Sequence, residues 1–150
     1  MMISKKIINS DFQSQITSLW TCFLLGTLFH TQLALMPLFH GLEVTHSHTD
    51  KVVNLDFVFW FMLLFFALPM LTIALTHFTT ARIYRKFHFG LTVIFTVLNF
   101  IHLAIDIVIA VPSYQIALMV LLFTIGIGLN VVSWQWLRYG HIVIPKTVVS

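Results

Sequence analysis

Two histidines lie deep inside long apolar runs, at matching positions. His30 is thirteen residues into the run 17–39, and His102 is thirteen residues into the run 89–111. If both runs are helices that cross a membrane in the same direction, a rise of about 1.5 Å per residue puts the two imidazoles at nearly the same height. Two such imidazoles can ligate a b-type haem from opposite faces. We therefore expect haem b with His30 and His102 as axial ligands, in an electron-transfer protein.

Three further residues lie within about one helical turn of these histidines. Gly26 precedes His30 and can leave room for a porphyrin ring, whereas Asn99 and Asp106 flank His102 on one face of its helix. An acid at this depth in a membrane is costly and indicates a functional site by default, with His102 as its partner. Asp106 can orient the His102 ring, move protons, or pair with it structurally. The sequence leaves these roles open, and Gly26, Asn99 and Asp106 join the expected cofactor-binding residues.

A second group of histidines lies in the polar segment after the first apolar run. His46 and His48 alternate with hydroxylated residues, so both rings point the same way if the segment is extended. With His40, Glu43 or Asp50 as a third ligand, they form a nitrogen and oxygen set that suits Zn²⁺, Cu²⁺ or Ni²⁺. We expect a divalent transition-metal site here, feeding an ion to the intramembrane histidines and Asp106, and metal handling or transport is an alternative function. A hydrated loop whose histidines bind nothing is the competing interpretation.

The composition determines what kind of elements hold these residues. The chain has 59% hydrophobic and 9% charged residues, whereas about a quarter of the residues of soluble domains are charged. Four apolar runs reach the ~20 helical residues that cross a bilayer core, which predicts an all-α, single membrane domain over residues 1–150. The expected segments are spans at 17–39, 56–79, 89–111 and 114–137, an outer loop at 40–55, an inner basic loop at 80–88, and a carboxyl-terminal tail at 138–150.

The basic residues predict how this domain is oriented. With the amino terminus inside, seven of the eight Lys and Arg residues fall on the cytoplasmic side, and Lys51 alone falls outside. Short connections make successive helices antiparallel neighbours. We therefore expect an up-down-up-down four-helix transmembrane bundle, with both termini inside, as a multi-pass integral membrane protein (of the plasma membrane in a bacterium). The basic residues are explained by the orientation of the chain in the membrane, and no nucleic-acid partner is expected.

The motifs of common enzyme classes are missing. The sequence has no Walker motif, nucleophile elbow, Gly-rich dinucleotide loop or His-Glu-x-x-His, so autonomous catalysis is not expected. A third interpretation is a non-catalytic accessory or assembly subunit, whose polar stripes are packing surfaces within a larger membrane complex. The expected partners are therefore the lipid bilayer together with a quinone or a larger membrane protein complex.

Overall fold

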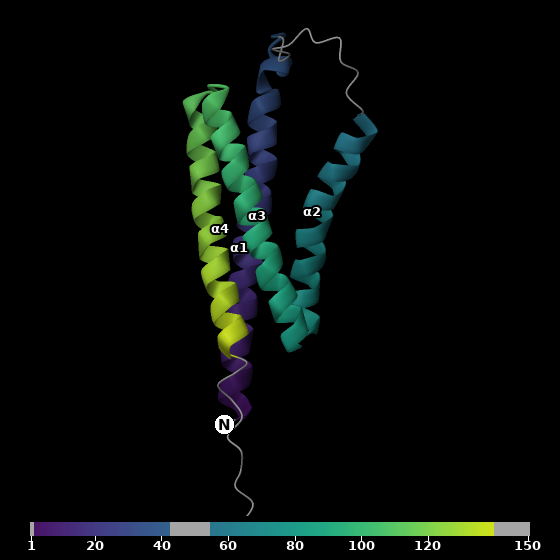
Figure 1. Cartoon of the computed structure of the whole chain (residues 1–150), viewed down its shortest axis with the longest axis vertical. Coiled ribbons are helices and arrows are strands. Elements are labelled where there is room, and N and C mark those ends of the chain that lie inside the picture. The colour runs from purple at the N-terminus through teal and green to yellow at the C-terminus, as the bar shows by residue number, and fades with distance from the viewer. Residues whose placement is uncertain (1, 43–54, 140–150) are drawn as a thin grey trace, which may run out of the picture.

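The computed structural model describes residues 2–42 and 55–139. Four helices follow one another along the chain: α1 (Met2–Phe39), α2 (Leu55–Phe78), α3 (Arg82–Val108) and α4 (Ser113–Tyr139). Each contains a stretch that is long and apolar enough to cross a membrane, and no strand occurs in the described ranges. The chain is thus an all-helical, four-helix protein of the multi-pass membrane type (Figure 1).

α1 and α3 end in the same kind of hydrogen-bonded turn. After α3, the N–H of Val111 donates to the carbonyl of Asp106 (3.1 Å), and the N–H of Ala110 donates to the carbonyl of Ile107 (3.2 Å). These two bonds form a Schellman motif, which needs a residue in the left-handed region. Ala110 takes that position with φ of 56°, whereas Gly41 takes it after α1 with φ of 72°. The motif holds the last turn of α3, from which the side chain of Asp106 projects.

α4 packs along both α1 and α3, and these three helices surround most of the buried core. The indole of Trp20 on α1 meets the ring of Phe95 on α3 edge to face, with centroids 5.3 Å apart, and Trp136 of α4 is fully buried. A Cβ atom on Gly26 would overlap Leu122 of α4. Gly26 therefore allows the close approach of α1 and α4, as small residues do in membrane helix pairs.

α2 joins the bundle through its second half. The hydroxyl groups of Thr76 and Tyr84 are hydrogen-bonded at 2.9 Å, and Thr17 lies 3.0 Å from the imidazole of His77. Towards its first residues α2 diverges from the other three helices (Figure 1). A cavity lies beside this part of α2.

Two helices extend beyond the predicted membrane spans. The inner basic loop expected at 80–88 is mostly helix, because α3 already begins at Arg82. Tyr84, Arg85 and His88 are all buried, so packing against the bundle extends the helix below the apolar run. Likewise α1 begins at Met2, well before the predicted start of the first span at 17. Most of the predicted outer loop (residues 43–54) and of the carboxyl-terminal tail (residues 140–150) lies outside the described residues.

Candidate metal centre

The structure brings His30, His102 and Asp106 together. His30 comes from α1, and the other two come from the last turns of α3 at positions i and i+4. Oδ2 of Asp106 lies 3.3 Å from Nε2 of His30, and Oδ1 lies 3.5 Å from Nε2 of His102. One ligand atom from each residue lies within 4.8 Å of the other two. Two helices that are distant in sequence therefore supply three potential metal ligands to one point.

The three side chains differ in burial. The side chains of His30 and Asp106 are 10% and 7% exposed, whereas the side chain of His102 is 56% exposed. The two imidazole rings meet edge to face, with centroids 5.3 Å apart and an interplanar angle of 85°. The Asp106 carboxylate and the His30 imidazole are thus enclosed in the bundle. The more exposed His102 imidazole lies between them and the space outside the bundle.

Two polar atoms at the centre lack a hydrogen bond. Among the residues that the structure describes, the buried Nε2 of His30 and Oδ2 of Asp106 form no well-directed hydrogen bond, and their closest polar contact is with each other at 3.3 Å. Buried polar groups are normally hydrogen-bonded, and an ionisable group at membrane depth is expensive without a partner. A cation held between the two atoms would satisfy both of them at once.

The distances suit a small transition-metal ion. Zinc binds histidine nitrogen and carboxylate oxygen at about 2.0–2.2 Å, so neighbouring ligands of a tetrahedral site lie roughly 3.3–3.5 Å apart. The separations of Asp106 from His30 and from His102 are 3.3 and 3.5 Å. Because each distance involves a different oxygen of Asp106, one edge of a site with a single carboxylate ligand atom already has the length that coordination requires, and the third ligand atom lies within 4.8 Å of the other two.

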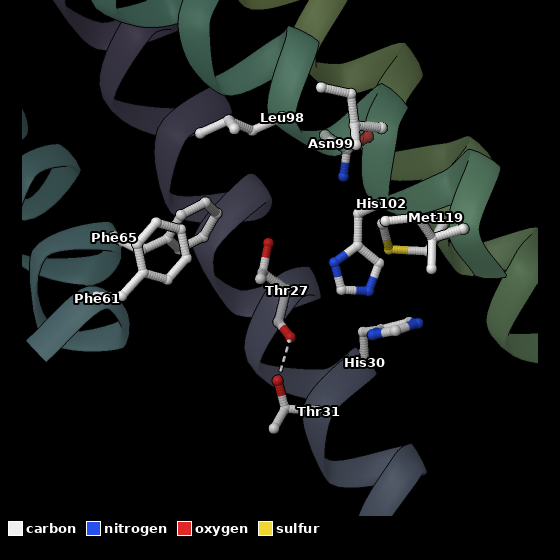
Figure 2. A pocket seen from close by; sticks show the side chains of 11 residues that line it. Thr27, His30, Thr31, Phe61, Phe65, Leu98, Asn99, His102 and Met119 are labelled. Atoms are coloured by element: carbon white, nitrogen blue, oxygen red, sulfur yellow. Dashed lines mark hydrogen bonds between the residues drawn. The ribbon is translucent and has the colours of Figure 1, made fainter. Parts of the chain in front are cut away.

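A cavity of about 240 Å³ adjoins the centre and is lined by residues from all four helices. Figure 2 shows Phe61 and Phe65 of α2 on one side of it, and His102 and Asn99 of α3 on the other. One ring nitrogen of His102 is directed into the cavity, and the other is directed towards His30 (Figure 2). His102 is therefore shared between the cavity and the metal centre.

The remaining predicted site residues lie in different places. Asn99 lines the cavity, and its Oδ1 is buried without a hydrogen-bond partner in the described part of the chain. Gly26, which was expected to make room for a porphyrin, packs against Leu122 of α4. The sequence could not reveal this contact, because it depends on how α1 is rotated against α4.

The predicted loop site falls mostly outside the described residues, which exclude His46 and His48. His40 is exposed in the turn after α1. It lies ten residues beyond His30, which corresponds to about 15 Å of helical rise. His40 is therefore too far from the metal centre to be one of its ligands in this arrangement.

A second buried histidine was not expected from the sequence. His88 is fully buried near the start of α3, and its Nε2 accepts a hydrogen bond from the indole N–H of Trp20 (3.1 Å). Nearby, the Arg85 guanidinium donates to the Trp136 carbonyl (2.9 Å) and to Oδ1 of Asn9 (3.0 Å). Steps of three or four residues continue the polar stripe of α3 back to both side chains, which is the signal that could have revealed them. The aromatic lining of the cavity has no such signal, since apolar residues abound in every span.

No protein-family model, curated protein or solved structure matches this chain.

Proposed function

We propose that this integral membrane protein binds a divalent transition-metal ion between His30, His102 and Asp106. The observation that carries the proposal is the cluster of ligand atoms from His30, His102 and Asp106, in which the buried Nε2 of His30 and Oδ2 of Asp106 face each other at 3.3 Å without a well-directed hydrogen bond within the described residues. Nitrogen and oxygen ligands of this kind suit Zn²⁺ and its neighbours in the first transition row. The ion would lie inside the helical bundle.

The proposed orientation is up-down-up-down, with both ends of the chain on the cytoplasmic side. The run of colour along the four helices in Figure 1 supports the antiparallel order. The placement of seven of the eight Lys and Arg residues on one side supports the direction. In this orientation the metal centre lies in the outer half of the bilayer, near the outer ends of α1 and α3.

The charge of the site suggests that the ion takes a further ligand. Two neutral imidazoles and one carboxylate leave a divalent ion with one uncompensated positive charge, which is unfavourable at membrane depth. Three protein ligands also leave the fourth position of a tetrahedral site open, as in zinc sites that exchange a water or substrate. Hydroxide or another anionic ligand would neutralise the charge. We therefore propose an exchangeable site rather than a closed structural one.

Haem ligation by the same two histidines is the competing proposal and has weaker support. A haem with two axial histidines separates their rings by the porphyrin plane. Here the rings are in edge-to-face contact at 5.3 Å, and the adjoining cavity of about 240 Å³ is smaller than the roughly 300–1,000 Å³ of typical ligand pockets. A single ion needs much less rearrangement. No geometric feature of the described residues favours the accessory-subunit interpretation over ion binding.

Metal analysis of the purified protein tests the proposal. Protein equilibrated with Zn²⁺ in detergent and passed through a desalting column should retain one ion per chain, and His30→Ala or Asp106→Asn should abolish retention. His77→Ala is a matched control, because this histidine lies on α2 beside Thr17. His40→Ala tests whether a histidine outside the bundle contributes to the site, and it should leave zinc retention unchanged. An unmodified protein that retains no zinc, copper or nickel overturns the proposal, and a Soret band lost in His30→Ala would establish haem instead.

A further inference from the structure

The cavity beside the metal centre has its mouth at bilayer depth. Residues on its rim remain strongly exposed: Phe61 is 53% exposed, Ile101 is 49% exposed and Ile105 is 52% exposed. All three belong to stretches of α2 and α3 that are apolar enough to lie in a membrane. A bare divalent ion is excluded from hydrocarbon, so this mouth suits a neutral, lipid-soluble molecule.

The interior of the cavity is polar on one side. His102 directs one ring nitrogen into it, and the amide nitrogen of Asn99 points towards that ring (Figure 2). The nitrogen of His102 that faces Asp106 is Nε2, so the nitrogen in the cavity is Nδ1. On the opposite side, Phe61 and Phe65 present aromatic rings (Figure 2). The cavity therefore combines a polar edge with an aromatic wall.

A metal ion at the centre would determine which hydrogen bond the cavity offers. An imidazole that binds a metal through Nε2 keeps its proton on Nδ1 and donates it. His102 would then present an N–H to the cavity next to the N–H groups of the Asn99 amide. Two neighbouring donors fit one oxygen acceptor, such as a carbonyl. This step rests on the proposed function, because the metal fixes the position of the proton.

The volume of the cavity limits the size of the molecule that carries this acceptor oxygen. An apolar cavity of about 150 Å³ holds benzene, so about 240 Å³ accommodates one substituted six-membered ring. A longer apolar tail would have to remain outside, in the lipid next to the first half of α2. Aromatic rings such as those of Phe61 and Phe65 favour contact with a flat ring.

We propose that this cavity binds a membrane-soluble ring carbonyl compound of the quinone class, whose carbonyl oxygen accepts hydrogen bonds from Nδ1–H of His102 and from the Asn99 amide. The ring lies between Phe61, Phe65 and His102, and the tail extends into the bilayer. The metal centre and the cavity are coupled through the single imidazole of His102. Occupation of the metal centre therefore strengthens binding in the cavity.

Equilibrium binding in phosphatidylcholine nanodiscs tests this proposal. The probe is a decyl-substituted 1,4-benzoquinone, and the control compound is decylbenzene, which has the same tail on a six-membered aromatic ring without carbonyl groups. Uptake by empty nanodiscs is subtracted. Zinc-loaded protein should bind one quinone per chain in a saturable manner and should bind no decylbenzene. Removal of zinc should weaken quinone binding about three- to tenfold, the effect expected of one hydrogen bond.

Variants separate the cavity from the metal centre. Asn99→Leu should weaken quinone binding about three- to tenfold through the loss of one donor, while zinc retention, which reports that the bundle is folded, stays at one ion per chain. Phe61→Ala should also weaken it, whereas Phe59→Ala should not, because Phe59 is likewise exposed on α2 but does not line the cavity.

The possible failures are distinct. Zinc-loaded protein that takes up no more quinone than empty nanodiscs overturns this inference and leaves the metal proposal standing. Equal quinone affinity with and without zinc would show that Nδ1–H of His102 is not the hydrogen-bond donor that the metal fixes. Protein that retains no zinc overturns the proposed function and, with it, the coupling.

Discussion

Replacement of Asp106 by asparagine should stabilise the metal-free protein and reduce the stabilisation that zinc provides. Asp106 is 5% exposed, and its Oδ2 has no hydrogen-bond partner within the described residues. A buried unsatisfied polar group costs about 1–3 kcal/mol, and more if it is charged. Asp106→Asn keeps the shape and removes the charge, so it should stabilise the metal-free protein by about 1–3 kcal/mol.

With zinc, weaker metal binding should offset this gain. At a zinc concentration about 1,000 times the Kd, binding stabilises the folded protein by about 4.1 kcal/mol. Loss of one of three ligands should weaken binding by at least the roughly 100-fold that loss of a supporting hydrogen bond can cause. Zinc would then stabilise the variant by only about 1.4 kcal/mol. The variant should therefore lose about 2.7 kcal/mol of zinc-dependent stabilisation.

Reversible unfolding in mixed detergent and lipid, with and without zinc, measures both quantities. Asp56→Asn is the matched control, because Asp56 is exposed in the first turn of α2. Two results would refute the reasoning. A variant with the full zinc-dependent stabilisation would show that the carboxylate is not a ligand. A metal-free variant destabilised by about 3–5 kcal/mol would show instead that Asp106 forms a buried ion pair with a protonated histidine.

Three further predictions concern the helices that hold the site. His88→Ala should destabilise the protein by about 1–3 kcal/mol in the same unfolding assay, because the buried indole N–H of Trp20 loses its acceptor; an unchanged midpoint would contradict that hydrogen bond. Gly26→Ala should cost about 1–3 kcal/mol by overpacking the interface of α1 and α4, while Gly128→Ala, where a Cβ meets nothing within 4 Å, should cause no loss. Ala110→Gly should stabilise the protein by about 1 kcal/mol, because glycine takes a positive φ without steric cost; a lower unfolding temperature in differential scanning calorimetry would contradict this.

The sequence predicts part of the candidate site. Equal offsets of His30 and His102 within their runs predict a common height, because helical rise per residue is constant. The spacing of His102 and Asp106 likewise puts them on one face of α3. Both relations arise within single helices, where backbone hydrogen bonds determine position along and around the axis. The three residues do meet in the structure.

The rotation of one helix against another cannot be predicted from relations within a single helix. Gly26 and His30 share one side of α1, yet Gly26 packs on Leu122 of α4 while His30 reaches Asp106 of α3. Which neighbour each side chain meets depends on the packing of whole helix surfaces. That packing also extends α3 back to Arg82, although its first turns lie before the apolar run.

The sequence by itself determined the class of protein, its four apolar helices and the positions of the ionisable residues along them, because these follow from composition and from the local geometry of the α-helix. The tertiary structure alone decided that the Asp106 carboxylate faces His30 as well as His102, and that Phe61 and Phe65 of α2 close a cavity beside them. Such contacts join residues far apart in the chain. They result from the fit of side chains between helices, which no local pattern encodes.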